Sequence, residues 1–199
     1  MAIQIGQKPS PTFAQPLELL SDCHRRVESF LRALLVVTEQ ANGGALDARH
    51  REALETALRY FREAAPRHTA DEEESLFPRM REHGGELARE AMDKLAALEA
   101  DHVRARRSHD IVEQLGNEWL RNGTLSSAEV KELAGHLQEL HGIYERHIAV
   151  EDNEIFPLAR QVLDAGTLKK VGEEMAGRRG QSFDSPFNSR RFGETGKQS

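Results

Sequence analysis

Histidine and glutamate recur at one spacing in two stretches of the chain that resemble each other. His68 is followed four residues later by Glu72, and His147 is followed by Glu151 in the same way. Both stretches read His-x3-Glu-x3-(Leu/Ile)-Phe-Pro, and they lie 79 residues apart. Because residues four apart are separated by only about 40° around an α-helix, each pair directs an imidazole and a carboxylate to the same place. Imidazole nitrogens and carboxylate oxygens are ligands for divalent metal ions.

Two more histidines extend this repeat upstream. The segment that ends in Asp-Cys-His24 matches the segment that ends in Ala-Asp-His102 at an offset of 78 residues. Each half is therefore expected to form a helical hairpin with one histidine in its first helix and His-x3-Glu in its second. Two such hairpins pack about a pseudo-two-fold axis, which brings equivalent positions to one level of a bundle. Six side chains lie on the apolar stripes of their helices and are expected to meet there: His24, His68, Glu72, His102, His147 and Glu151.

The predicted cluster would bury two carboxylates, which is costly in an apolar interior unless a cation lies between them. No Lys or Arg lies on these stripes at that level. Two divalent ions, held by four neutral imidazoles and two bridging carboxylates, would stabilise the cluster and leave room for a solvent bridge and an exchangeable position. A single buried histidine is more often an ordinary hydrogen-bonded core residue, but six polar residues related by a repeat favour a dinuclear site. His-x3-Glu alone is weak evidence, since His141 and Glu145 show the same spacing.

Apolar residues spaced three and four apart predict four long helices that would carry these side chains. Pro66 lies inside the second helix and should kink it, because proline lacks a backbone N–H and clashes with the preceding turn. The fold class expected is all-α, an up-down-up-down four-helix bundle with a short fifth helix and a flexible tail. The four helices are expected at about 16–40, 46–82, 86–121 and 126–163. The regions are an N-terminal extended arm (1–14), the bundle (15–165), the short helix (166–179) and a disordered tail (180–199).

The composition limits the possible functions. With 199 residues, of which 38% are hydrophobic and 30% charged, the chain is expected to be a soluble globular protein. It has no run of roughly 18 apolar residues that could span a membrane and no secretory signal at its start, so a cytoplasmic protein is expected. A net charge of −6 gives no basic field for nucleic acid. The single cysteine, Cys23, excludes an internal disulfide framework and a cysteine-rich metal site.

Two residues outside the predicted ligand set could support it. Tyr144 lies one turn before His147 on the same face, where its hydroxyl could hydrogen-bond a ligand or a bridge; simple core packing is the alternative. His109 follows His102 by two turns, roughly 10 Å along the helix axis. This distance is too long for the same pair of metals but suits an outer polar network.

Several neighbours of the predicted ligands are expected to point elsewhere. Glu73, Glu74 and Asp152 follow the predicted bridging carboxylates but rotate away by about 100° or more, so we expect them on the solvated surface. Cys23 precedes His24 and is also expected to point aside.

Together these residues resemble the hemerythrin-like family of HHE cation-binding domains, which are four-helix bundles with a non-haem di-iron centre. The resemblance covers about residues 16–163. It implies that two irons are bound, with this division of ligands: His24 and His68 on one, His102 and His147 on the other, and Glu72 and Glu151 bridging both.

The pattern departs from oxygen-carrying hemerythrin, which has a fifth histidine. This sequence has no His-x3-His pair to supply it, so the resemblance does not imply reversible oxygen carriage. The set of four histidines and two glutamates is more similar to two other groups. One comprises bacterial di-iron proteins that repair iron–sulfur clusters damaged by nitric oxide or oxidants, and the other is the iron-sensing domain of a ubiquitin-ligase subunit. The repair proteins carry a cysteine-containing module before the bundle, where this chain has only an arm with prolines.

The function expected from the resemblance is that of a non-haem di-iron protein that binds, senses or detoxifies O2, peroxide or nitric oxide, for instance in a stress response. Spacing alone does not select the metal, because manganese and zinc accept the same ligands; the resemblance favours iron. One alternative is a di-iron oxidoreductase that consumes peroxide or repairs iron–sulfur clusters. Another is an iron or oxygen sensor that acts through a protein partner. The partners expected are a small diatomic or peroxide ligand and a protein partner or reductant, with neither nucleic acid nor a membrane.

Overall fold

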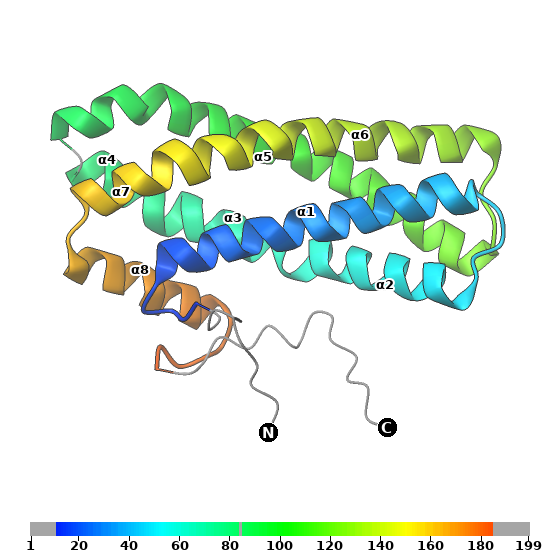
Figure 1. Cartoon of the computed structure of the whole chain (residues 1–199), viewed down its shortest axis with the longest axis horizontal. Coiled ribbons are helices and arrows are strands. Elements are labelled where there is room, and N and C mark those ends of the chain that lie inside the picture. The colour runs from blue at the N-terminus through cyan, green and yellow to red at the C-terminus, as the bar shows by residue number, and fades with distance from the viewer. Residues whose placement is uncertain (1–10, 84, 185–199) are drawn as a thin grey trace, which may run out of the picture.

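The computed structural model describes residues 11–83 and 85–184 of the chain, and these form an elongated bundle of antiparallel helices (Figure 1). The first column of the bundle is α1 (Pro16–Ala41). The second column returns along it in four consecutive segments: α2 (Ala48–Glu63), α3 (Ala65–Ala70), the π-helix η1 (Asp71–Leu76) and α4 (Phe77–His83).

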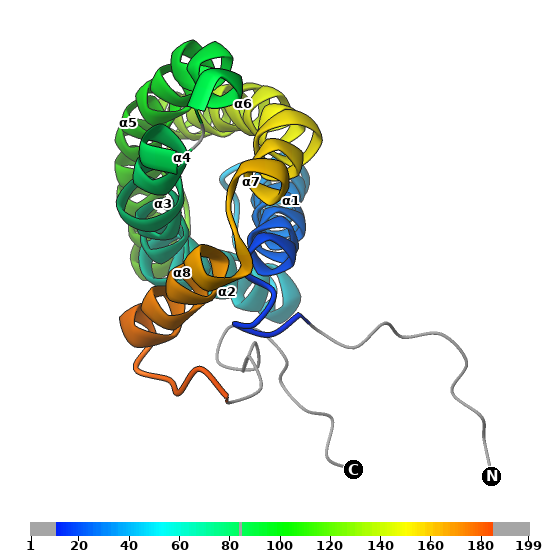
Figure 2. The same cartoon turned by 90° about the vertical axis from the view of Figure 1, so that its left-hand side faces the viewer.

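The second half of the chain repeats this arrangement. The third column is the single long helix α5 (Gly85–Asn122). The fourth comprises α6 (Ser127–Val150), the π-helix η2 (Glu151–Ile155) and α7 (Phe156–Val162). Seen end-on, the four columns surround a common axis (Figure 2). The described residues contain no strand, and the predicted all-α four-helix bundle is confirmed.

A shorter helix, α8 (Ala165–Arg178), lies against one end of the bundle, as predicted for the C-terminal segment. It contacts α1 and η1. A close approach to the chain before α1 requires glycine at position 172, because a Cβ there would lie 1.9 Å from the carbonyl oxygen of Phe13. Phe13 is fully buried, so the end of the predicted extended arm packs into the fold. Residues 1–10 of that arm lie outside the described part.

The predicted tail begins as an ordered segment. Phe183 is partly buried against the apolar residues at this end of the bundle, and Nζ of Lys169 lies 5.8 Å from the centre of its ring. The remaining residues of the predicted tail, 185–199, lie outside the described part. No described helix is both long and apolar enough to cross a membrane.

Proline shapes the second and fourth columns. The second column is interrupted at Ala64, and Pro66 follows in the first turn of α3, in the stretch where the sequence predicts a kink. The two π-helices were not predicted. Each ends just before a Phe-Pro pair, in which Pro78 or Pro157 offers no N–H to the carbonyl four residues earlier and crowds it. That carbonyl belongs to Glu74 or Asn153, inside the π-helix, so the proline favours the wider turn.

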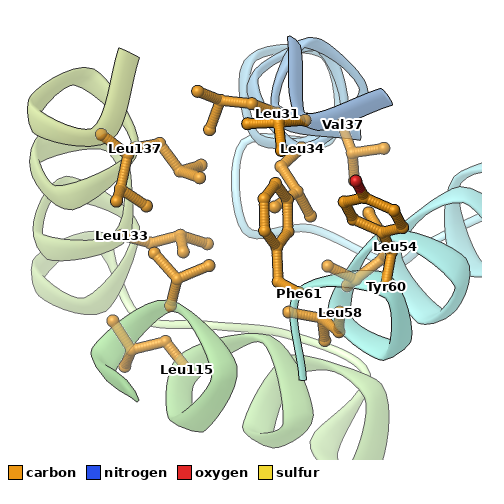
Figure 3. Packing of buried hydrophobic residues seen from close by; sticks show 14 of the residues in the cluster. Leu31, Leu34, Val37, Leu54, Leu58, Tyr60, Phe61, Leu115, Leu133 and Leu137 are labelled. Atoms are coloured by element: carbon orange, nitrogen blue, oxygen red, sulfur yellow. The ribbon is translucent and has the colours of Figure 1, made fainter. Parts of the chain in front are cut away.

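The buried apolar residues form two clusters, one toward each end of the bundle. One cluster contains Leu31, Leu58 and Leu137, packed between all four columns (Figure 3). The other contains Leu20 and Leu98, with residues of α4, α7 and α8. On α1 and α5, the apolar residues before His24 and His102 belong to the second cluster, and those after them belong to the first. The polar cluster therefore lies between two apolar layers.

Candidate metal centre

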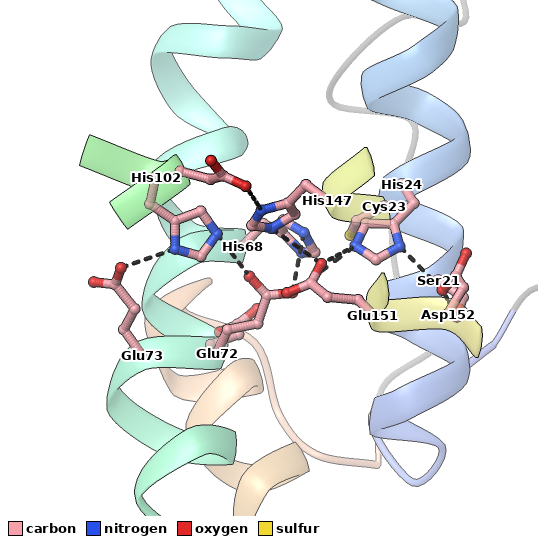
Figure 4. A network of polar contacts seen from close by, with 12 residues as sticks. Ser21, Cys23, His24, His68, Glu72, Glu73, His102, His147, Glu151 and Asp152 are labelled. Atoms are coloured by element: carbon pink, nitrogen blue, oxygen red, sulfur yellow. Dashed lines mark hydrogen bonds and ion pairs between the residues drawn. The ribbon is translucent and has the colours of Figure 1, made fainter. Parts of the chain in front are cut away.

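The structure brings the six predicted ligand residues together in the middle of the bundle (Figure 4). All six are buried, and the two glutamates are 0% exposed. They form two overlapping groups, in each of which the four possible ligand atoms lie within 4.8 Å of one another. The first group is His24, His68, Glu72 and Glu151, and the second is Glu72, His102, His147 and Glu151. The grouping is the same as the division of ligands that the family resemblance implies.

Both glutamates lie between the two histidine pairs. Oε1 of Glu72 is 3.2 Å from Nε2 of His68, while Oε2 of the same carboxylate is 3.4 Å from Nε2 of His102. Oε2 of Glu151 is 3.0 Å from Nε2 of His24 and 3.2 Å from Nε2 of His147. Each carboxylate thus faces one histidine from each pair, which is the placement that a bridging ligand requires.

The chemistry of these atoms fits metal ions. All four carboxylate oxygens of Glu72 and Glu151 are buried without a hydrogen-bond partner among the described residues, as is Nε2 of His24. Leaving buried charged groups unpaired costs several kcal/mol each. These nitrogen and oxygen atoms lie close together without the geometry of hydrogen bonds, as atoms do that ligate the same metal ion. One divalent cation in each of the two four-ligand groups would compensate both carboxylates.

The outer ring nitrogens of two of these histidines are held by carboxylates from the opposite half of the chain. Nδ1 of His24 lies 3.0 Å from Oδ1 of Asp152, and Nδ1 of His102 lies 2.8 Å from Oε1 of Glu73. An ionised carboxylate can only accept, so both Nδ1 atoms donate and both Nε2 atoms are directed at the glutamates. Ser21 donates a second hydrogen bond to Asp152.

The prediction that Glu73 and Asp152 lie on the solvated surface was therefore wrong. Both side chains are about one-third exposed. A rotation of about 100° from the ligand position does not lead to solvent in this bundle, because the neighbouring helix presents a histidine ring there. Glu74, with its side chain 67% exposed, does lie on the surface as expected.

The sequence comparison agrees with this geometry. The chain matches the family described as the hemerythrin HHE cation binding domain over residues 15–159, which is most of its length. The chain belongs to the hemerythrin family. It is also similar to a Haemophilus influenzae protein described as "Uncharacterized protein", with 29% identity over 174 residues that cover 84% of this chain and 92% of that protein.

The two halves of this hemerythrin domain differ around the remaining histidines. Nδ1 of His147 lies 3.7 Å from Oδ2 of Asp101, a charge contact that is too long for a hydrogen bond. Nδ1 of His68 is buried without a partner in the described part of the chain. The repeat places Cys23, an apolar and buried thiol, where the second half has Asp101. The two halves of the chain are thus more alike in the six ligand residues than in the groups that surround those residues.

Protons on the histidines partly compensate the negative charge of the two glutamates. Burial disfavours the charged form of His24, but its hydrogen bond to Asp152 and the carboxylate of Glu151 outweigh this and raise its pKa well above the ordinary value. Against the same effect of burial, Glu72 raises the pKa of His102 to about 9. For His68, burial dominates and lowers the pKa to about 4. Protons on His24 and His102 thus occupy nitrogens that a metal ion would need, and metal uptake must release them.

Tyr144 and His109, the two supporting residues predicted from the sequence, lie next to each other. A hydrogen bond of 2.7 Å joins the Tyr144 hydroxyl to Nε2 of His109, and the ring of His109 packs on Phe61 with 4.5 Å between the ring centres. Burial lowers the pKa of His109 to about 4, so the imidazole is neutral. The hydroxyl of Tyr144 therefore hydrogen-bonds to His109 and not to one of the six cluster residues.

An ionic contact that the sequence did not predict anchors the segment that carries Glu72. The preceding residue, Asp71, is 0% exposed, and its carboxylate accepts hydrogen bonds from Arg178 and Arg179 at the end of α8, with distances of 2.6 to 3.1 Å. One turn earlier in α8, Glu174 pairs with Arg79. The signal in the sequence was the adjacent pair of arginines after an otherwise ordinary helix. The repeat gave no help, because Val150 takes the place of Asp71 in the second half.

Proposed function

We propose that this hemerythrin-family protein holds two iron ions at the buried cluster and uses them to bind O2, peroxide or nitric oxide. The observation that carries the proposal is the pair of four-ligand groups that share two glutamates whose oxygens lack hydrogen-bond partners among residues 11–83 and 85–184. His24 and His68 would hold one ion and His102 and His147 the other. Iron is preferred on the family resemblance, since the ligand atoms also suit manganese and zinc.

The histidine side of the cluster has space for a very small molecule. A cavity of about 20 Å3 is lined by all four histidines and closed by residues that include Val27 and Ile148. Roughly 10–15 Å3 is enough for one water molecule. Two irons held in this way would supply electron exchange and an open position for a diatomic molecule or peroxide. The apolar layers on both sides limit the access of bulk water to that position.

A second candidate function, an iron or oxygen sensor, is favoured by the contact between Asp71 and α8. Asp71 is adjacent to Glu72, so a change of metal occupancy at Glu72 would reach the C-terminal helix through a single peptide link. A protein partner that recognises α8 or its docking surface would then read the state of the centre. A reductant would be required for repeated redox turnover, as in the oxidoreductase alternative.

The test is the metal content of anaerobically purified protein, measured by mass spectrometry together with absorption spectra before and after exposure to air. We expect about two irons per chain and a new near-ultraviolet band after oxidation. His68→Ala and Glu151→Ala should reduce the content, whereas His141→Ala should not, although His141 belongs to the same sequence pattern. One zinc or no metal in the wild type would refute the proposal. Peroxide consumption above that of free iron would identify an oxidoreductase.

A further inference from the structure

A second, larger cavity adjoins the metal cluster from one side of the bundle. It has a volume of about 310 Å3 and lies between α2 and α3 on one side and α5 on the other. Its walls are mainly apolar, with Leu58, Phe61 and Val112 among them. The ion pair between Arg62 and Glu113, 3.0 Å long and partly exposed, lies among the residues that line it. The cavity thus combines an apolar interior with charged groups that meet solvent.

This cavity leads to the metal cluster. It shares Ala65, Thr69, His102 and Tyr144 with the small cavity over the four histidines. Ala65 is the first residue of α3, directly after the interruption at Ala64. The small side chain at the break therefore lies in the wall that the two cavities share.

The internal repeat supplies a comparison, because an equivalent groove lies between α1 and α6. That groove has a volume of about 240 Å3, and its lining includes Leu31, His141 and Tyr144 but none of the six cluster residues. Tyr144 is the repeat equivalent of Ala65, 79 residues later, and a large ring stands there in place of a methyl group. The bundle therefore has two related grooves, of which only the one beside Ala65 reaches the cluster.

The open cavity also differs in polarity at its inner end. His109, which lines it, is the repeat equivalent of Leu31 in the closed groove. Its Nε2 bonds to the Tyr144 hydroxyl, while its Nδ1 is buried and has no hydrogen-bond partner in the described part of the chain. A neutral imidazole and a phenol can donate to and accept from an uncharged hydroxyl.

We propose that this cavity binds a small organic molecule with an apolar body of about ten heavy atoms and one uncharged hydroxyl-bearing head, which lies between the His109–Tyr144 pair and the metal cluster. The inference rests on the proposed function for the placement of the head beside bound metal. The apolar body follows from the walls and the size, since an apolar cavity of about 150 Å3 already accommodates benzene. A diatomic ligand alone would need only the small inner cavity.

The test uses 2-phenyl-2-propanol as the probe, with cumene, the same skeleton without the hydroxyl, for comparison. Calorimetric titration of metal-loaded wild type should show saturable binding of the alcohol. Ala65→Tyr copies the residue that closes the other groove and should weaken that binding at least tenfold with metal content retained. Ala97→Tyr, at an exposed position on α5, is the matched control and should bind as the wild type does. Tyr144→Phe should weaken binding of the alcohol roughly two- to tenfold and leave cumene unchanged.

A measurement on the wild type alone covers the case in which Ala65→Tyr fails to fold. In zinc-loaded protein, nuclear Overhauser contacts should join the aromatic protons of the probe to the methyl groups of Leu58 and Val112. Absence of saturable binding, equal binding by folded Ala65→Tyr, or contacts at other sites would overturn the inference. Iron at two per chain without probe binding would leave the proposed function intact. Probe binding at this cavity in a protein that takes up no metal would refute the proposed function and support the binding site.

Discussion

Asp152 accepts a hydrogen bond from Nδ1 of His24 across 128 positions of sequence, at a distance of 3.0 Å. The reciprocal contact joins His102 to Glu73 at 2.8 Å. In each case the first helix of one hairpin supplies the histidine and the second helix of the other hairpin supplies the carboxylate. The two hairpins are therefore braced against each other at the level of the cluster. The orientation of His24 and His102 depends on this packing and not on either hairpin alone.

Loss of either brace should weaken metal binding at one of the two positions. Carboxylates that hold a ligating histidine typically contribute 10- to 100-fold to metal affinity, because they fix the ring and raise its basicity. Asp152→Ala should lower affinity by about that factor at the position shared by His24 and His68. Glu73→Ala should do the same at the position of His102 and His147. Competition with a chelator of known affinity, read as metals retained per chain, measures both.

Asp93→Ala is the control for these variants, since Asp93 is an exposed carboxylate on α5 away from the cluster. Asp152→Asn can still accept a hydrogen bond from His24 and should fall between the wild type and Asp152→Ala. Equal retention of both metals in all four variants would mean that the braces do not orient the ligands.

The fold and the six inner residues were accessible from the sequence because they follow periodic rules. Apolar spacing predicted the helices, and the repeat placed His24 and His102 opposite the two His-x3-Glu pairs. The groups behind them were missed for a physical reason. Whether Asp152 meets solvent or a histidine depends on which helix lies next to it, and no spacing within one helix contains that information. The contact of Asp71 with α8 is likewise a product of tertiary packing.

The buried carboxylate of Asp71 predicts a large effect of its arginine partners on stability. Arg179 is the nearer of the two, with Nη2 2.6 Å from Oδ2 of Asp71. Arg179→Met should lower the free energy of unfolding by about 3 kcal/mol, because it leaves a buried charge with only part of its compensation. The double variant Asp71→Asn/Arg179→Met should recover much of this loss, since no uncompensated carboxylate remains. Urea unfolding followed by circular dichroism gives the comparison, and additive effects of the two substitutions would contradict it.

Removal of the metals should destabilise the whole bundle. Each site at a free metal concentration of 100 times its Kd contributes about 2.7 kcal/mol, and 1 kcal/mol corresponds to about 2–4 °C for a protein of this size. Chelation of both metals should therefore lower the Tm by roughly 10 to 20 °C, with a loss of helicity at intermediate temperature. Glu145→Ala, outside the cluster, should show the same fall, while His68→Ala should respond less to the chelator. An unchanged Tm in the wild type would show that the cluster remains buried without ions.

The thiol of Cys23 should be chemically inert while the bundle is folded. Cys23 is buried, and burial raises its pKa from 9.0 to about 11. The thiolate fraction at pH 8 is then about 100-fold lower than for an ordinary cysteine, and reactivity should rise only as the pH approaches 11. The rate of reaction with a disulfide reagent at pH 8 measures this, with Ser29→Cys as a positive control because Ser29 is exposed on the same helix. The introduced thiol should react rapidly and Cys23 only after unfolding; equal rates in the folded protein would show that the thiol is accessible and would reopen a redox role for it.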